Sequence, residues 1–205
     1  MNNSNQKVIF IISNDLLFIH QHLFHIINDL INKKNHKVYL VSNSKSIDQF
    51  KFPPNANYLP IPITRKPNIF NDLKTLLKLI ILIKSKKPNL LFSFTPKAGF
   101  LSALLKFFFN SYLHIHTFTG QVWATMKGNK SNFYKLIDSF IANNSNLALA
   151  DSISQAEFIN ENLNLRTEIT HPIINTDLSS ATVDTSQYLN FADTVETGFT
   201  SDVSN

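Results

Sequence analysis

The sequence contains no cysteine, and this absence sets the first limits on the protein. Without thiols the chain can form neither a disulfide framework nor a thiolate metal site. Arginine is also scarce, because only Arg65 and Arg166 among the 19 basic residues are arginines. Lysine is a point charge, so the formal net charge of +5 suits a membrane surface or phosphate groups as well as nucleic acid. Of these partners we expect no nucleic acid.

Long hydrophobic runs are missing as well. The longest apolar region, "LLKLIILIK" (76–84), is interrupted by lysines and is far shorter than the roughly 20 residues that cross a bilayer. The N-terminal segment has no small-residue cleavage site of the kind that follows a signal peptide. We therefore expect a cytoplasmic protein, with peripheral association on the inner face of the cell membrane as an alternative.

Common nucleotide and hydrolase motifs are absent from the chain. No G-x-G-x-x-G follows the first predicted strand, which weakens a dinucleotide-binding interpretation. A P-loop and a G-x-S-x-G nucleophile elbow are missing too.

What the sequence does contain is an alternation of short apolar runs with helical periods. The predicted strands cover 7–13, 37–43, 57–63, 89–95, 112–118 and 146–151, and the predicted helices cover 16–31, 69–83, 98–109, 131–143 and 153–163. Pro60 and Pro62 would confine the third strand to a sheet edge or cut it short. Repeated strand–helix–strand units predict a doubly wound α/β domain with a mainly parallel sheet.

The character of the chain changes after about residue 165. The region that follows is rich in Thr, Ser, Asp and Asn and shows no sustained period. We predict a domain over residues 1–165 and a linker or disordered polar tail over residues 166–205.

Glycine is rare, and its distribution is uneven. Three of the four glycines and the single tryptophan fall in residues 94–128. Within that window, "FSFTPKAGF" (92–100) places Thr95, Lys97 and Gly99 where a strand ends and a helix begins. The helix amides and Lys97 would favour an anion, and Gly99 would admit a ligand or a neighbouring strand. The alternative is an ordinary turn with a solvent-facing lysine.

A second polar strand end follows in "HIHTFTGQVW" (114–123). His116, Thr117 and Thr119 could hydrogen-bond a substrate hydroxyl, Gly120 would open the backbone, and Trp123 could stack on a sugar. The alternative is a pair of histidines satisfied within the core or its rim. No Cys, Asp or Glu nearby completes a ligand set with the histidines, so we predict no metal site.

Two basic apolar segments, 71–87 and 98–110, are typical of helices that could lie on an anionic membrane. The alternative is that both cover the sheet and present their lysines to solvent.

The combination "FTPKAG…HIHTFTGQVWATMKG…ADSISQAEFI" resembles bacterial family 4-like glycosyltransferases of capsular polysaccharide, exopolysaccharide or O-antigen synthesis. The resemblance implies a Rossmann-like domain, the N-terminal half of a GT-B architecture, that holds a lipid-linked or glycan acceptor. A second, C-terminal domain would bind the nucleotide-sugar donor, UDP-linked, and hexosyl transfer would occur in the cleft between the two.

The resemblance also implies roles for particular residues. Thr95, Lys97 and Gly99 would face the cleft, with Lys97 near phosphate. Many relatives have a histidine where this chain has Thr119, so the predicted catalytic pair is Thr119 and His116, the nearest histidine. Thr117, Gly120 and Trp123 would complete the substrate-binding set.

The chain departs from the family pattern in length, and residues 171–180 resemble the interdomain crossover. We therefore expect a transferase half that lacks its donor domain, binds no cofactor itself, and is inactive unless a separate donor-domain chain completes it. The alternatives are a non-catalytic, membrane-associated acceptor-binding or scaffold module, and a decayed fragment.

Overall fold

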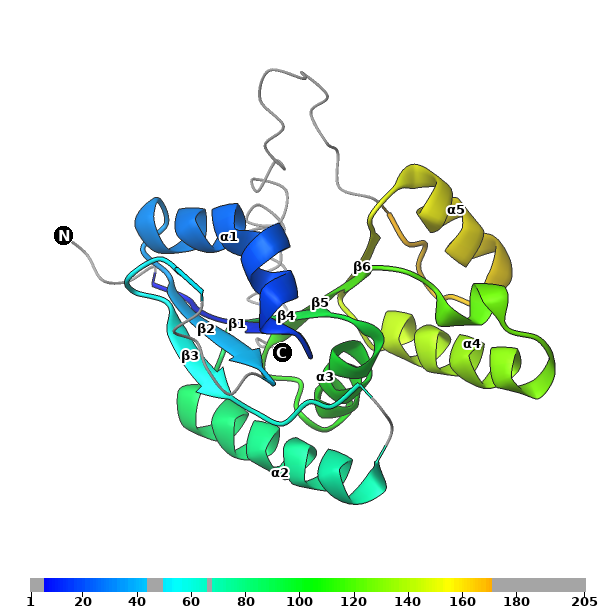
Figure 1. Cartoon of the computed structure of the whole chain (residues 1–205), viewed down its shortest axis with the longest axis horizontal. Helices are drawn as coiled ribbons and strands as arrows, with labels where there is room; N and C mark the ends of the chain where they lie inside the picture. The colour runs from blue at the N-terminus through cyan, green and yellow to red at the C-terminus, as the bar shows by residue number, and fades with distance from the viewer. Residues whose placement is uncertain (1–5, 44–49, 66–67, 171–205) are drawn as a thin grey trace, which may run out of the picture. The chain divides into compact units, whose positions relative to one another are not determined.

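The computed structural model describes residues 6–43, 50–65 and 68–170, and its centre is a parallel sheet (Figure 1). The six strands are β1 (Val8–Ile12), β2 (Lys37–Ser42), β3 (Asn57–Pro60), β4 (Leu90–Phe94), β5 (Leu113–Phe118) and β6 (Leu147–Ala150). They lie in the order β3-β2-β1-β4-β5-β6, and every neighbouring pair is parallel. The predicted doubly wound fold is confirmed, and β3 is an edge strand that ends at Pro60.

Five α-helices connect and flank these strands: α1 (Leu16–Asn32), α2 (Ile69–Lys86), α3 (Pro96–Phe108), α4 (Gly128–Asn143) and α5 (Ile153–Asn162). A short 3-10 helix, η2 (Val122–Thr125), follows β5. The local sequence explains where several helices start. Asp15, Asn68 and Ser152 each accept a hydrogen bond from a first-turn amide, which typically stabilises a helix by about 1 kcal/mol. At α5 the side chain of Gln155 also reaches back and accepts a hydrogen bond from the Asp151 amide.

The helices form layers on the sheet. In Figure 1, α1 covers one face and α2 and α3 cover the other, while α4 and α5 lie at the β6 end. The central strands are buried on both faces, which explains why β1 and β4 read as continuous apolar runs without alternation. One core cluster joins the sheet to α2 and α3, and a second joins α4, α5 and η2 to β5 and β6.

The chain continues to pack on this domain beyond residue 165. Thr170 forms a parallel bridge with Leu149 of β6, and the side chain of Asn160 exchanges hydrogen bonds with the backbone of Ile169. Ile169 is 2% exposed. The predicted tail from residue 171 onward lies outside the described residues.

Among the residues that the structure describes, no helix combines the length and the apolar character needed to span a bilayer.

Candidate functional site

The direction of strand order reverses between β1 and β4, so these two neighbours define the switch point of the sheet. In open α/β sheets, ligands bind outside the carboxyl ends of the strands at such a point. Asn14 follows β1, Thr95 follows β4, and Thr117 lies near the end of β5. Both strand ends that the sequence predicted as polar sites are therefore at or beside the switch point.

Buried polar atoms without partners gather at this edge. Apart from Asp72 Oδ1, which is paired with Lys97, seven side-chain atoms of the described residues are buried with no hydrogen-bond partner, and five of these belong to residues at or just after the carboxyl ends of strands. The five atoms are Asn14 Oδ1, Ser42 Oγ, Thr95 Oγ1, Thr117 Oγ1 and Gln121 Nε2. Since an unpaired buried polar group costs about 1–3 kcal/mol, such a concentration is expected where a ligand supplies the missing partners.

Thr95 has a strained backbone. Its φ of 71° and ψ of 144° lie in a region that a β-branched residue rarely adopts. The conformation turns the chain from β4 directly into α3, whose first residue is Pro96. The side chain of Thr95 makes no capping hydrogen bond to the first turn of α3, which begins beside the switch point. Backbone strain of this kind typically costs about 1–3 kcal/mol and is found mainly at functional sites.

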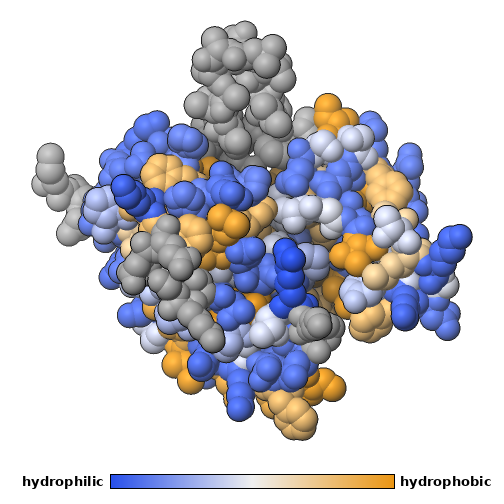
Figure 2. Space-filling view, viewed as in Figure 1, coloured by the Kyte–Doolittle hydropathy of each residue, from blue (hydrophilic) through white to orange (hydrophobic). Residues whose placement is uncertain are grey.

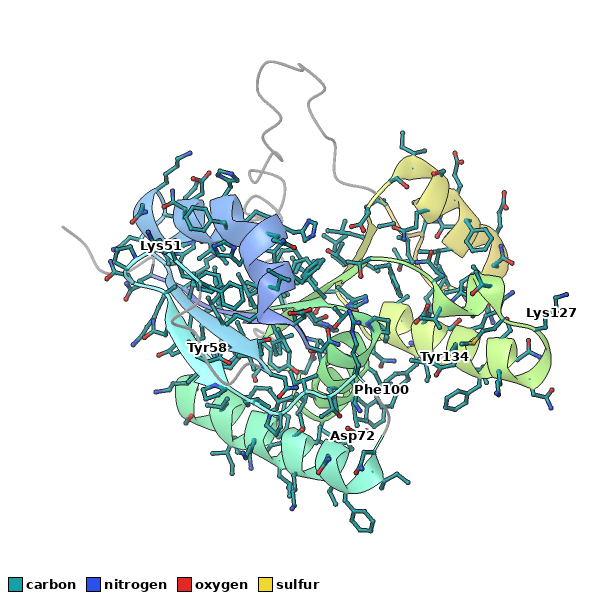
Figure 3. The ribbon with its side chains drawn as sticks, in the orientation of Figure 1. Lys51, Tyr58, Asp72, Phe100, Lys127 and Tyr134 are labelled. Carbon is teal, nitrogen blue, oxygen red and sulfur yellow. The ribbon has the colours of Figure 1, made fainter. Side chains whose placement is uncertain are left out.

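Lys97 is paired with an acidic residue that the sequence analysis did not consider. Its Nζ contacts Oδ1 of Asp72, in the first turn of α2, and its side chain is only 14% exposed. Figure 3 shows Asp72 where α2 approaches α3. Lys97 is therefore not the solvent-facing lysine of the alternative interpretation, and any phosphate would compete with Asp72 for its charge.

Gly99 lies against His116 and has no room for a side chain. A Cβ atom at position 99 would stand 2.3 Å from Cε1 of His116. Gly99 therefore admits a neighbouring strand rather than a ligand, which was one of the two roles predicted for it.

The two strand histidines form a buried hydrogen-bond chain. Ser93 Oγ lies 2.8 Å from His114 Nε2 and 2.8 Å from His116 Nδ1. His114 Nδ1 lies 3.4 Å from the Asn144 carbonyl, which can only accept. His114 therefore carries its proton on Nδ1, and its Nε2 accepts the hydroxyl proton of Ser93. The Ser93 oxygen in turn accepts a hydrogen bond from Nδ1–H of His116.

Burial keeps both rings neutral. It lowers the pKa of His114 to about 4 and lowers the pKa of His116 well below its ordinary value. His116 is 1% exposed. The prediction of His116 as a catalytic residue is corrected on this ground, because the ring is enclosed between β5 and α3 instead of facing a substrate. His116 is instead a core histidine whose hydrogen bond is made within the protein, as the alternative interpretation expected.

The other residues predicted at the end of β5 do lie together at the carboxyl edge. Thr117 is 6% exposed, and it pairs in register with Phe94, whose ring contacts Phe18 of α1. Thr117 therefore points to the α1 side of the sheet, opposite His116. Thr119 is half-buried, and exposed Gly120 has a φ of 138° with open space where a Cβ would be.

Trp123 is a core residue, which corrects its predicted role in stacking on a sugar. Its ring is 2% exposed and stacks on Phe158 of α5 at 5.1 Å. Its Nε1 donates to Oδ2 of Asp138 at 2.7 Å. Burial raises the pKa of Asp138 to about 6, partly opposed by the Trp123 hydrogen bond. Periodicity could not reveal this packing, because it brings together residues from η2, α4 and α5.

Sequence reasoning missed several groups at the carboxyl edge. Asn14, Ser42 and Gln121 carry unpartnered atoms, and the first two could have been found as polar residues at the ends of apolar runs. Asp151, directly after β6, has a pKa raised by desolvation and opposed by the charge of His22. Within the described ranges, no three His, Asp or Glu side chains converge as metal ligands.

These features define a Rossmann-like domain with a polar site at its switch point. No family model matches the chain. The sequence is 36% identical over 103 residues to the capsular polysaccharide biosynthesis glycosyltransferase CapM of Staphylococcus aureus. That match takes in 50% of this chain and 26% of the relative.

Solved structures share the fold at low sequence identity. A sucrose-phosphate synthase chain from Thermosynechococcus elongatus has a TM-score of 0.66 at 10% identity, over 92% of this chain and 99% of that one. Anabaena HepE, solved with UDP, has a TM-score of 0.55 at 14% identity, over 80% of this chain and 43% of that one. The predicted resemblance is confirmed: the chain is similar to a capsular glycosyltransferase, and its fold is that of a GT-B N-terminal-like domain.

Proposed function

We propose that this domain is the acceptor-side half of a glycosyltransferase of surface polysaccharide biosynthesis. The reaction would be hexosyl transfer from a nucleotide-sugar to a lipid-linked or glycan acceptor. The sequence relative named as a capsular polysaccharide glycosyltransferase supports this proposal. Support for a nucleotide-sugar donor comes from a structural neighbour, Anabaena HepE, which was solved with UDP and glucose.

The observation that carries the proposal is the set of unpartnered hydroxyl and amide groups at the carboxyl edge. A sugar presents hydroxyls that donate and accept at short intervals, so it suits an edge that carries polar groups such as Asn14, Thr95 and Thr117. A largely apolar ligand would leave these groups unpaired and would bind poorly for that reason.

We assign acceptor binding to Thr95 and Thr117, with Thr119 nearest the reacting centre. Gly120 allows the acceptor to approach the backbone, because open space lies where its side chain would be. An acceptor phosphate would draw Lys97 away from Asp72. The UDP-linked donor would be held by a second domain, to which residues 166–205 would lead, and transfer would require that domain.

A non-catalytic acceptor-binding module is the second candidate. The enclosed His116 favours it, because the histidine of the predicted catalytic pair then does not face a substrate. The two candidates share the same acceptor site and differ only in whether a donor domain restores transfer.

The test replaces the Thr117 hydroxyl by a methyl group. Thr117→Val should lower the affinity for a water-soluble prenyl-diphospho-hexose about tenfold, measured by isothermal titration calorimetry. It should leave the free energy of unfolding unchanged or raise it by about 1 kcal/mol, because the lost hydroxyl has no partner in the protein.

The matched control is Thr75→Val. Thr75 is also buried, but its hydroxyl donates to the Pro62 carbonyl at 2.9 Å. This variant should lose about 1–3 kcal/mol of stability and keep its affinity. Unchanged affinity of Thr117→Val for every sugar probe that the wild type binds would reject the assigned site.

A further inference from the structure

Helix α2 has a second apolar row that the domain leaves uncovered. Five large apolar side chains on this helix are between 52% and 84% exposed: Ile69, Phe70, Leu73, Leu77 and Ile81. Orange side chains appear along the lower margin of Figure 2, which α2 occupies in Figure 1. Isolated exposed apolar residues are ordinary, but a row of five on one helix marks an interaction surface.

The uncovered row lies opposite the row that packs on the sheet. Thr75, Leu79 and Ile83 are the buried residues of α2, at four-residue spacing. Leu73, Leu77 and Ile81 repeat with the same spacing but are offset by two residues, or about 200° around the helix. The core therefore accounts for only one of the two apolar faces.

Lysines flank the uncovered row. Lys74 follows Phe70 by four residues, Lys78 precedes Ile81 by three, and Lys84 follows it by three, spacings that make them neighbours on a helix surface. All three lysines are exposed. The single acidic residue of α2, Asp72, is paired with Lys97 of α3. The outer face of α2 therefore combines apolar and positively charged groups without a negative one.

We propose that this outer face docks the domain on an anionic phospholipid surface, with α2 lying in the plane of the membrane interface. Apolar side chains would enter the acyl boundary while the lysines contact phosphate headgroups. Charge complementarity selects an anionic bilayer over a purely apolar protein partner. The sequence left open whether these lysines were merely the solvated face of a sheet-covering helix. The structure shows them beside an exposed apolar row. This inference does not depend on the acceptor site, which lies at the carboxyl edge of the sheet.

The test is co-sedimentation of the full chain with vesicles of phosphatidylglycerol and phosphatidylcholine, and with vesicles of phosphatidylcholine alone. Wild type should bind the anionic vesicles and lose binding in high salt, because the Debye length falls from about 10 Å at 0.1 M to about 3 Å at 1 M. Phe70→Gln with Leu77→Gln should weaken binding at least about tenfold. Replacing Lys74, Lys78 and Lys84 by Gln should weaken it on the order of 100-fold.

The matched control is Phe133→Gln with Leu136→Gln, which removes an exposed phenylalanine and an exposed leucine from α4. This variant should bind as wild type does, and all variants should keep the wild-type melting temperature. Equal loss in the control, equal binding to neutral vesicles, or no effect of the α2 variants would overturn the proposal. So would a wild-type dimer that the α2 substitutions convert to a monomer, because the face would then join two copies of the chain.

Discussion

The imidazole of His116 fills the space that a side chain at position 99 would need, and this contact fixes how α3 lies on β5. The ring also packs edge-on against Phe118, with 4.5 Å between the ring centroids, and it is hydrogen-bonded to Ser93. It can therefore move little without breaking the buried hydrogen-bond chain. At this scale the glycine and the histidine are one structural unit.

This contact predicts that the effect of Gly99→Ala on stability changes sign when His116 is replaced by alanine. Gly99→Ala should destabilise the wild type by about 1–3 kcal/mol, because the new Cβ would overlap the His116 ring. In a His116→Ala background the same substitution should be neutral or stabilising by up to about 1 kcal/mol, since alanine favours a helix over glycine. Urea unfolding followed by Trp123 fluorescence measures both effects. Equal effects in the two backgrounds would show that the two residues are not coupled.

The turn from β4 into α3 has an unusual backbone. Its Thr95 has both an unpartnered buried hydroxyl and a positive φ. Each of these features lowers the stability of the domain when no ligand is bound. Both costs are expected of a segment shaped for a ligand rather than for stability.

The strain can be measured by comparing two substitutions. Thr95→Gly should raise the free energy of unfolding by about 1 kcal/mol, because relief of the strain exceeds the entropic cost of glycine. Thr95→Ala removes the same hydroxyl but keeps a Cβ, so it should raise the free energy of unfolding by less than Thr95→Gly does. Chemical denaturation of both variants gives the difference. A Gly variant no more stable than the Ala variant would rule out backbone strain at this position.

For the whole molecule, buried ionisable groups set how stability depends on pH, and they act in opposite directions. His114 has a lowered pKa of about 4, so the unfolded chain takes up protons first and stability falls as the pH drops from 6.5 toward 4. Asp138 has a raised pKa of about 6, so the folded chain keeps this proton to a higher pH than the unfolded chain does. Its contribution is present at acidic pH and is lost as the pH rises through 6.

Asp138→Asn isolates this second effect. Asparagine does not titrate and can still accept the Trp123 hydrogen bond. Relative to wild type, the variant should gain about 2 kcal/mol in unfolding free energy between about pH 4 and about pH 7.5. Urea unfolding at several pH values tests this. If the difference between the two proteins does not change with pH, the carboxyl of Asp138 has no raised pKa.

The sequence by itself determined the order and type of the elements, because periods of two and 3.6 residues and local caps such as Ser152 act within a few residues. It also placed Thr95 and Thr117 at the carboxyl ends of neighbouring strands, since parallel strands end at one edge. Tertiary structure decided the rest. The His116 contact with Gly99, the Lys97 pair with Asp72 and the burial of Trp123 each join separate elements. Their distances follow from sheet register and helix packing, which no local pattern contains.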